Sequence, residues 1–341
     1  MKAIVLKDFG GPEQLQLETV PTPQPDAHEV LVRIEAAGVC HHDLMHRAGK
    51  LPGAHTGVVL GHEVSGEVVE VGAQVHHLKV GSRVVVYQRR FCGQCRDCLR
   101  GRQDLCRALG LPSVDTEGAY AEYLRVPAAS AVQLPDSIGY ADAALACCPI
   151  ATSVRALVSQ AQLKPGETVL INGASGGLGA HQLQLARSLG ARVIAVTGSA
   201  DKVDFLRTLG AHDVVVAGSE GYSAAVWQLT GRQGVDVAME NIGHTLHDTL
   251  RSMAMGGRVV VLGNVQPGTV PVSPGLLIGR RLSLLGSGSA TLEDLRTALA
   301  MIAAGQVRPL IDRVLPFTEV AQAHALLENR QVNGRIVLSG W

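Results

Sequence analysis

A glycine-rich turn between a strand and a helix is the feature that most constrains how this chain folds. The segment TVLINGASGGLGA begins at Thr168 with an apolar strand pattern and runs into a helical stretch, GGLGAHQLQLARSLGA. Strand-like and helical segments then alternate, from ARVIAV through HDVVVA and GVDVAMEN to GGRVVVLGN. Because such alternation is typical of βαβ units, we predict a parallel sheet covered by helices.

The turn itself has the small residues that a bound dinucleotide requires. Ala174, Gly176 and Gly179 form an A-x-G-x-x-G pattern. Small residues permit the tight turn, Gly176 lets the backbone approach a pyrophosphate, and Gly179 lets the helix pack against the strand. The helix N-terminus favours the phosphate charge. We therefore predict a dinucleotide site, with a glycine-rich turn of some other α/β domain as the alternative.

The first third of the chain shows a different pattern. Short alternating segments such as HEVLVRIEAA and SGEVVEVG are separated by turns that carry Pro or Gly, which predicts mostly β structure. The tail, which ends in TEVAQAHALLEN and GRIVLSG, is expected to return to this first domain. We expect an α/β protein with a catalytic domain over 1–145, completed by 288–341, and a cofactor domain over 146–287.

Composition argues against several classes of partner. Lys and Arg together number 30, Asp and Glu also number 30, and aromatic residues make up 3% of the chain. Such a chain lacks the basic excess and the stacking aromatics of nucleic-acid binders. Prolines and glycines interrupt the uncharged stretch Val259–Ile278, and the first residues, MKAIVLKDFG, alternate like a strand, so we expect neither a membrane span nor a signal peptide. We expect a cytoplasmic protein with a small-molecule substrate and without nucleic-acid or membrane partners.

Four of the seven cysteines are clustered in a polar segment. Cys92, Cys95, Cys98 and Cys106 form a C-x2-C-x2-C-x7-C pattern. Two-residue gaps let a tight turn direct neighbouring sulfurs toward one ion, and four thiolates can close a tetrahedron around zinc. Since four protein ligands leave no open position, we predict a structural zinc here; free thiols in a loop are the alternative.

A second candidate metal site is spread along the chain. GVCHHDL supplies Cys40, LGHEVSG supplies His62 and Glu63, and LACCPIATSVRAL supplies Cys147 and Cys148. One thiolate, one imidazole and a further thiolate or carboxylate would hold zinc with a position open for substrate. Spacing alone does not pair residues this far apart, and a single buried cysteine is usually a small hydrophobic residue. From the residues alone, both interpretations stay open.

Together these motifs resemble the zinc-containing medium-chain dehydrogenase/reductase superfamily, of which alcohol dehydrogenase is the familiar member. The family's G-x-C-H-x-D, G-H-E, four-cysteine and strand–glycine turn–helix motifs all occur here in its order. The resemblance covers essentially the whole chain. It implies a GroES-like, mostly β catalytic domain joined to a Rossmann domain with a doubly wound parallel sheet. It also implies a homodimer or homotetramer.

The resemblance assigns roles to the candidate catalytic residues. The implied ligands of a catalytic zinc are Cys40, His62, Cys148 and, as an alternative fourth, Glu63. Cys148 is preferred to Cys147 because it stands nine residues before Leu157, which matches the family's C-A-G-I-T-V-Y-K-A-L segment. Asp43 would orient the zinc-bound histidine. His42 replaces the Ser or Thr that starts the family's proton relay, and it is the candidate proton donor.

The resemblance also implies a set of cofactor contacts. His41 would contact the pyrophosphate. The other expected contacts are Thr152, Ala174, Ser175, Gly176, Gly177, Leu178, Gly179, Thr197, Gly198, Ser199, Lys202, Gly263, Asn264, Val265, Ser287 and Gly288.

We expect NADPH to be preferred over NADH. Recognition of NAD normally uses an Asp or Glu at the end of the second strand, and the residues after ARVIAV, from Thr197 to Ala200, are not acidic. Asp201 lies 22 residues beyond Gly179, but it falls within the start of the next helix, where acids are common. Lys202 could meet a 2′-phosphate. The alternative is a pocket that accepts both cofactors.

Three functions follow as hypotheses. The first is a zinc-dependent oxidoreductase that transfers a hydride between NAD(P)H and an alcohol/aldehyde or ketone. The second is NADPH-dependent reduction of an activated C=C bond, as in an enoyl-CoA or enone. The GASGGLG turn, which resembles the quinone and acryloyl-CoA reductase branches, and His42 favour this second reaction. The third is a non-enzymatic dinucleotide-binding sensor, against which the intact ligand set argues.

Overall fold

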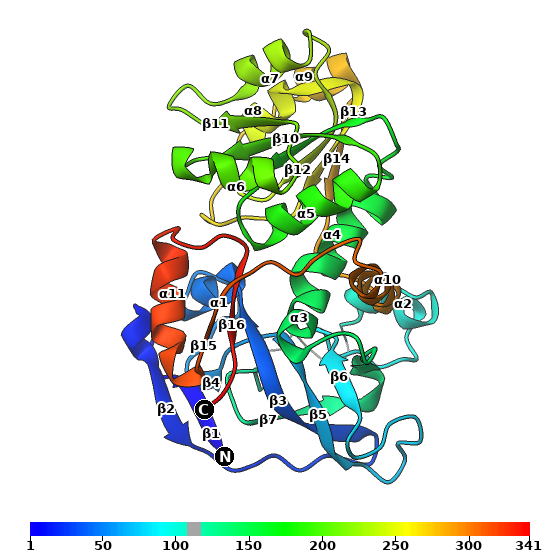
Figure 1. The fold of residues 1–341 in the computed structure, drawn as a ribbon, viewed down its shortest axis with the longest axis vertical. Helices are drawn as coiled ribbons and strands as arrows, with labels where there is room; N and C mark the ends of the chain where they lie inside the picture. Colours follow the sequence, from blue (N-terminus) through cyan, green and yellow to red (C-terminus); the bar gives the residue numbers. More distant parts are fainter. Residues whose placement is uncertain (108–116) are drawn as a thin grey trace. The chain divides into compact units, whose positions relative to one another are not determined.

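The structure of this chain is a computed structural model that describes residues 1–107 and 117–341 (Figure 1). The described chain separates into two compact units. Unit 1 comprises Met1–Ala151, Ser289–Ala303 and Ile311–Trp341. Unit 2 comprises Thr152–Gly288 and Ala304–Leu310.

The limits of the units differ from the expected domain boundaries in three places: after residue 145, at Gly288 and over residues 304–310. The helical run Tyr140–Gln160 continues past the boundary expected at 145/146, and the chain passes into unit 2 after Ala151. Residues 304–310, expected in the first domain, belong to unit 2. The backbone N–H of Leu310 donates to Nε2 of His181 at 2.9 Å, which helps to hold this segment in unit 2.

Unit 1 is built mainly of strands. The strands are β1 (Lys2–Leu6), β2 (Leu15–Thr19), β3 (Glu29–Val39), β4 (Val58–Val59), β5 (Glu63–Val71), β6 (Arg83–Val86), β7 (Tyr123–Pro127), β8 (Ala131–Gln133), β15 (Ile311–Leu315) and β16 (Arg335–Leu338). The α-helices are α1 (His41–Arg47), α2 (Arg96–Leu99), α3 (Tyr140–Leu145), α10 (Leu292–Ala303) and α11 (Val320–Glu328). Short turns of other helix types are η1 (Pro12–Gln14), η2 (Gln103–Leu105), η3 (Ala128–Ser130), η4 (Ala146–Ala151) and η7 (Phe317–Glu319).

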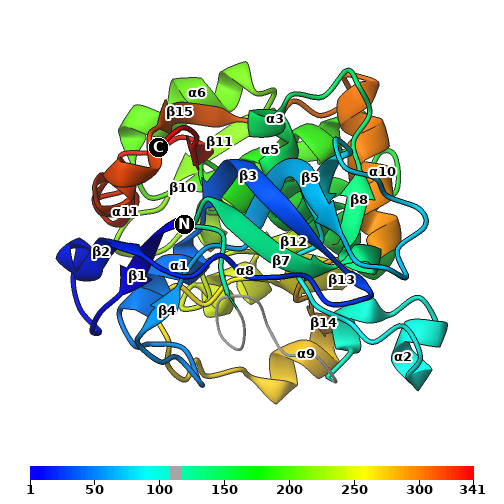
Figure 2. The same cartoon turned by 90° about the horizontal axis from the view of Figure 1, so that it is seen from below.

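Strand β3 is central to the larger of two described sheets in unit 1. The sheets have the orders β2-β1-β4 and β15-β16-β3-β5-β6-β8, with β7 also paired to β3. Figure 2 shows β3 beside β5 and β7. Val30, Val32 and Val39 of β3 belong to the buried core, as expected for β-branched residues in a central strand. The last residues of β3 pair antiparallel with both β5 and β16.

Unit 2 is a parallel sheet between two layers of helices. Its strands are β9 (Thr168–Asn172), β10 (Arg192–Thr197), β11 (Asp213–Val216), β12 (Val235–Glu240), β13 (Met253–Val261) and β14 (Ser283–Gly286). Its helices are α4 (Thr152–Val154), η5 (Arg155–Gln160), α5 (Gly177–Ser188), η6 (Ala200–Lys202), α6 (Val203–Thr208), α7 (Ser223–Leu229), α8 (Leu246–Arg251) and α9 (Pro274–Arg280). Helices α5 and α6 cover one face, and α7, α8 and α9 cover the other (Figure 1).

The strand order of unit 2 is that of a doubly wound sheet. The described strands follow the order β11-β10-β9-β12-β13-β14, and every pair is parallel. The first strand, β9, therefore lies between the second and the fourth. The order reverses between β9 and β12, and ligands of such sheets bind at this point, beyond the carboxyl ends of the strands. The predicted α/β class, with a mostly β unit and a parallel-sheet unit, is confirmed.

One helical run in the described residues is long and apolar enough to cross a membrane. It spans Tyr140–Gln160, with a mean hydropathy of 1.4 over its most apolar window. However, 78% of that window is buried inside the protein. Burial of this extent is what a core helix shows, because a helix apolar on all sides must be covered by other elements.

An ion pair across unit 2 generates a stability prediction. Arg258 of β13 donates through Nη1 and Nη2 to the two carboxylate oxygens of Glu167 at 3.0 and 2.7 Å. Its Nε donates to the carbonyl of Ala161 at 2.8 Å. Burial raises the pKa of Glu167, but the hydrogen bonds from Arg258 and from the backbone of Lys164 outweigh it, so this pKa lies below its usual range. The pair therefore stabilises unit 2 when Glu167 is ionised.

We expect Glu167→Gln to lower the free energy of unfolding by about 1–2 kcal/mol at neutral pH, because a bidentate charge-assisted pair is lost. A folded-state pKa below the unfolded value gives stability that is present above the unfolded pKa and lost as pH falls through the folded pKa. In urea unfolding, the difference in stability between the Glu167→Gln variant and the unmodified protein should therefore shrink toward zero as the pH falls through the lowered pKa of Glu167. Glu293→Gln, which breaks an exposed pair with Arg296, is the control and should change little. Equal stability of the Glu167 variant and the original at neutral pH would contradict the prediction.

Candidate active site

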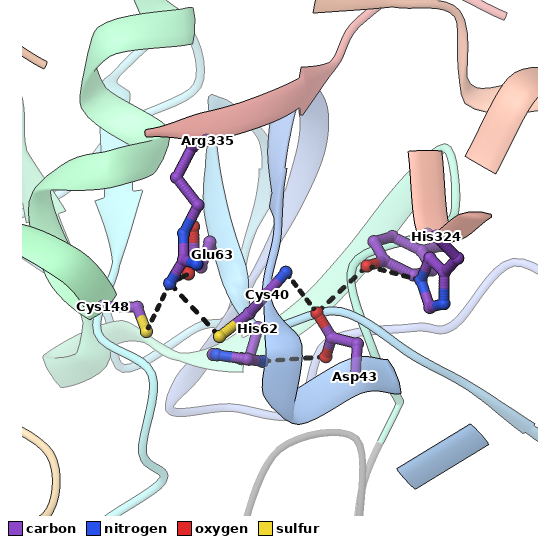
Figure 3. Close-up of polar contacts among 8 residues, drawn as sticks. Cys40, Asp43, His62, Glu63, Cys148, His324 and Arg335 are labelled. Carbon is purple, nitrogen blue, oxygen red and sulfur yellow. Dashed lines mark hydrogen bonds and ion pairs between the residues drawn. The ribbon is translucent and has the colours of Figure 1, made fainter. Parts of the chain in front are cut away.

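Four side chains from separate parts of unit 1 converge on one point. Cys40 follows β3 and precedes α1, His62 and Glu63 stand at the start of β5, and Cys148 lies in η4. One potential ligand atom from each lies within 4.8 Å of those of the other three. Figure 3 shows these side chains facing one another. The arrangement offers two sulfurs, one imidazole nitrogen and one carboxylate oxygen to a single ion.

The pairing of β3 with β5 explains how residues far apart in sequence meet. Gly38 of β3 lies opposite Glu63 of β5 in the antiparallel register. A Cβ atom at position 38 would stand 2.1 Å from Oε2 of Glu63, so this strand position requires glycine. The absence of a side chain at Gly38 thus gives the glutamate its place beside Cys40.

Arg335 belongs to the same cluster and was not predicted. It starts β16, whose residue Ile336 pairs with Val39 of β3. Its Nη2 lies 2.9 Å from Oε1 of Glu63 and 3.2 Å from Sγ of Cys40. Burial raises the pKa of Glu63 to about 7, although the Arg335 charge opposes this shift. No local pattern in GRIVLSG distinguishes Arg335 from the first residue of an ordinary strand, so only the sheet register reveals it.

The two thiols of the cluster differ in charge. The hydrogen bond from the Cys148 thiol, together with the nearby Arg335 guanidinium, holds the pKa of Cys40 well below its usual range despite burial. The same hydrogen bond and burial raise the pKa of Cys148. Cys40 is therefore the sulfur that ionises first, and thiolates are the form of cysteine that binds metals.

His62 is held in one orientation by Asp43. Its Nδ1 lies 3.0 Å from Oδ1 of Asp43, whose Oδ2 accepts a hydrogen bond from the backbone N–H of Cys40 at 3.0 Å. Burial lowers the pKa of His62, but the charge of the Asp43 carboxylate raises it well above its usual range. With Nδ1 bonded to the carboxylate, Nε2 is the nitrogen left for a metal.

The neighbouring histidines of α1 occupy different positions. The His42 ring lies edge-on to that of His62, with 5.3 Å between the centroids. Its Nδ1 is buried and has no hydrogen-bond partner among the described residues. Burial and the nearby His62 charge lower the pKa of His42, so its ring is mainly neutral near pH 7. His41 is the first residue of α1, and its expected pyrophosphate contact stays a prediction.

The cysteine lobe also forms a compact cluster. Sulfur atoms of Cys92, Cys95, Cys98 and Cys106 all lie within 4.8 Å of one another, and none of the four forms a disulfide. The backbone N–H groups of Gln94 and Cys95 lower the pKa of Cys92 to about 6. Four sulfurs at this spacing can enclose one ion and leave no ligand position open.

In unit 2, the predicted glycine turn joins β9 to α5. Gly173 has a φ of +64°, and Gly176 precedes the first residue of α5. A Cβ at Gly179 would stand 2.3 Å from the carbonyl oxygen of Gly173, so the helix packs against the turn only because this residue is glycine. At Gly176 the nearest atom would be 3.5 Å away, so its glycine is not required by protein packing.

The other expected cofactor residues of unit 2 lie mostly beyond the carboxyl ends of its strands. Thr197 ends β10, Gly263–Val265 follow β13, and Ser287 and Gly288 follow β14. Thr152 is the exception, since it starts α4. The structure thus brings the predicted turn and these segments to the same edge of the sheet, the edge at which such sheets bind dinucleotides.

Glu240 at the end of β12 was not predicted and organises this edge. It is fully buried, and its Oε1 accepts hydrogen bonds from the backbone N–H groups of Ile242 at 2.9 Å and Gly243 at 2.8 Å. The side-chain amide of Asn172, the last residue of β9, donates to both carboxylate oxygens at 3.2 Å. The carboxylate therefore joins the loop after β12 to the turn after β9.

Comparisons with known proteins agree with this architecture. Residues 26–136 match the family model of the alcohol dehydrogenase GroES-like domain, and residues 177–304 match that of the zinc-binding dehydrogenase. An acryloyl-coenzyme A reductase of Metallosphaera sedula is 32% identical and aligns over 99% of this chain and 100% of its own length. An alcohol dehydrogenase of Geobacillus stearothermophilus is 34% identical over 99% of both chains. The crystal structure of AibC has a TM-score of 0.93 at 43% identity and covers 100% of this chain and 96% of its own.

These matches extend over nearly the whole chain and include both kinds of domain. The predicted GroES-like and Rossmann architecture is confirmed, and the protein is an oxidoreductase of the alcohol dehydrogenase type. This chain belongs to the zinc-containing medium-chain dehydrogenase/reductase superfamily.

Proposed function

We propose that this protein is a zinc-dependent, NADPH-linked oxidoreductase that interconverts alcohols with aldehydes or ketones. The observation that carries the proposal is the cluster of two thiols, one imidazole and one carboxylate, with His62 oriented by Asp43. Sulfur and imidazole donors in this combination suit zinc, and an exchangeable carboxylate leaves a position for substrate. The similarity to alcohol dehydrogenases supports the same reaction.

Each residue of the cluster has a distinct part in this proposal. Cys40, His62 and Cys148 would hold the zinc, and Glu63 would be the alternative fourth ligand. Bound zinc would supply a Lewis acid for the substrate oxygen, and the nicotinamide would supply or accept the hydride. His42, whose buried Nδ1 has no partner among the described residues, would take up a proton during oxidation and return it during reduction.

A second zinc would have a structural role in the cysteine lobe. Cys92, Cys95, Cys98 and Cys106 offer four sulfurs and no open position, which supports a closed tetrahedral site. We therefore propose two zinc ions per chain. We also propose a cytoplasmic homodimer or homotetramer, as the family resemblance implies.

The second candidate reaction is reduction of an activated C=C bond in an enoyl-CoA or enone. The similarity to an acryloyl-coenzyme A reductase favours it, as does a histidine at position 42. Product analysis separates the candidates: NADPH oxidation by enones without any alcohol product would favour C=C reduction. Turnover of an alcohol and aldehyde panel that depends on zinc would favour the first candidate. Full activity after removal of the catalytic zinc would overturn it.

We expect Cys40→Ala to lower kcat/KM by about 100-fold or more. Loss of a metal ligand should reduce activity more than the 10–100-fold typical of losing a residue that hydrogen-bonds to a ligand. Zinc analysis should show about one ion per chain instead of about two, with cofactor affinity unchanged. Cys147→Ala is the matched control, since Cys147 is buried next to Cys148 but lies outside the cluster. Near-normal turnover of Cys40→Ala, or loss of the same zinc from Cys147→Ala, would contradict the ligand assignment.

Cys95→Ser should destabilise the protein more than it changes the chemistry. A lobe of this kind depends on its metal, so we expect loss of one zinc and a decrease in Tm of about 5 °C or more. The activity of the variant, measured per folded chain, should stay close to that of the unmodified protein. Cys40→Ala provides the reciprocal control, because it should lose the other zinc and keep the lobe. An unchanged Tm with both zinc ions retained would argue against a structural site.

For the cofactor, we expect a higher kcat/KM with NADPH than with NADH. The side chain of Asp201 is 73% exposed, whereas that of Lys202 is 9% exposed, and 3.9 Å separates their charged atoms. The end of β10 carries no acid that would repel a 2′-phosphate. Lys202→Ala should raise KM for NADPH more than for NADH, while Asp201→Asn should leave the NADPH constants unchanged. A tenfold or greater preference for NADH would show that Asp201 reads the ribose.

A further inference from the structure

We propose that a buried chain of hydrogen bonds, Arg47–His324–Tyr120–Asp43, holds the Asp43 carboxylate so that it orients His62. Arg47, His324 and Tyr120 would then be positioning residues of the metal centre. The proposal deepens the proposed function, because it rests on metal binding by His62.

The chain of contacts runs entirely through unit 1, and Figure 3 shows its part between His324 and Asp43. Nη1 of Arg47, in α1, lies 3.3 Å from Nδ1 of His324, in α11. Nε2 of His324 lies 3.4 Å from the hydroxyl of Tyr120, which lies 3.0 Å from Oδ2 of Asp43. The other carboxylate oxygen, Oδ1, bonds to His62. All five side chains are largely or fully buried, so water does not compete for these contacts.

The direction of each hydrogen bond follows from Arg47. A guanidinium has only donors, so Nδ1 of His324 must accept, and its proton is on Nε2. That N–H donates to the Tyr120 oxygen, and the phenol hydrogen is then directed to Asp43. Burial lowers the pKa of His324 to about 3 and raises that of Tyr120 well above its usual range, so both side chains are neutral. The opposite direction would place two N–H groups against each other between Arg47 and His324.

The consequence is a carboxylate held by three donors. Oδ2 of Asp43 receives the Tyr120 hydroxyl and the backbone N–H of Cys40, and Oδ1 receives the N–H of His62. Oδ1 is thereby fixed toward His62 and holds the ring in the tautomer that leaves Nε2 for the metal.

Arg47 itself is anchored at the far end of the chain. Its Nε donates to the carbonyl oxygen of Gly10 at 3.0 Å, and its Nη2 forms an ion pair with Glu328 of α11. The Arg47 side chain is 1% exposed, whereas that of Glu328 is 41% exposed. Burial of an arginine charge without such partners would be energetically costly. The remaining nitrogen, Nη1, is the one that donates to His324 and starts the chain.

The first test measures zinc affinity, by chelator competition, in the purified zinc-loaded protein. Tyr120→Phe and His324→Leu should each weaken the zinc at Cys40 and His62 by about 10-fold, as expected for a group behind a ligand, and keep the lobe zinc. His324→Gln should restore near-original affinity, because its amide offers an acceptor to Arg47 and a donor to Tyr120. The control is Tyr87→Phe, which also removes a buried phenol hydrogen bond, to the carbonyl of Ala290, outside the chain.

A merely structural role predicts a different outcome. In that case Tyr120→Phe would bind zinc as tightly as Tyr87→Phe, or His324→Gln would lose as much affinity as His324→Leu, and either result overturns the proposal. Replacement of the zinc by cobalt provides a second, spectroscopic measurement on the same site. We expect the visible spectrum of the cobalt site to change in Tyr120→Phe and to stay unchanged in Tyr87→Phe.

The second test does not depend on bound metal. The ¹⁵N chemical shifts of the His324 ring in the full-length protein should show a proton on Nε2 and none on Nδ1. A proton on Nδ1 would reverse the chain and overturn the proposal, whether or not zinc is present. If the unmodified protein is found to hold no zinc at Cys40 and His62, that result counts against the proposed function. The ¹⁵N shifts of His324 still decide the direction of the hydrogen-bond chain in that case.

Discussion

The antiparallel pairing of β3 with β5 on one side and β16 on the other is the constraint on which the candidate metal site depends. It places the end of β3, with Gly38 and then Cys40, against Glu63 and against the start of β16, which carries Arg335. Sheet hydrogen bonds set this register, and a shift by one residue would turn Glu63 to the opposite face. The register therefore determines which charged groups share the buried space beside Cys40.

Buried charge is tolerated there because each charged group lies beside an opposite charge. Glu63 and Arg335 form an ion pair within 2.9 Å, and the Asp43 carboxylate is bonded to His62 and to Tyr120. Breaking such a pair leaves an uncompensated charge in the interior, which is costly. The same pairs hold the candidate metal ligands in place. The stability of this part of unit 1 and the geometry of its cluster thus depend on the same contacts.

In unit 2, a single buried carboxylate satisfies the polar groups around it. Glu240 sits at the point where the strand order reverses, between β9 and β12, and it accepts hydrogen bonds from both neighbouring connections. Backbone N–H groups in the loop after β12 would be unsatisfied without it. A polar network at this point keeps the glycine turn and the adjoining loop in a defined arrangement, which suits a surface that recognises a pyrophosphate.

Local sequence was sufficient for features that depend on neighbouring residues. The glycine turn, the βαβ alternation, the four-cysteine lobe and most strands and helices follow from patterns a few residues long, and the structure has them where they were expected. The elements of unit 2 that were not predicted include α9 and β14: α9 follows prolines and glycines, and β14 is a short exposed edge strand. Segments of this kind carry too little apolar periodicity to be recognised from sequence.

The sequence by itself determined the chemistry available to this protein: two groups of candidate metal ligands and one glycine turn of the kind that binds dinucleotides. Only the tertiary structure decided which distant residues act together. Arg335 lies 295 residues after Cys40, and His324 also belongs to the C-terminal part of the chain; both come close to Cys40 and Asp43 through sheet register and helix packing. Arg335 and His324 have no local motif, because their environment is made by strands and helices from elsewhere in the chain. Long-range packing, which no short pattern encodes, is the reason they could be found only in the folded protein.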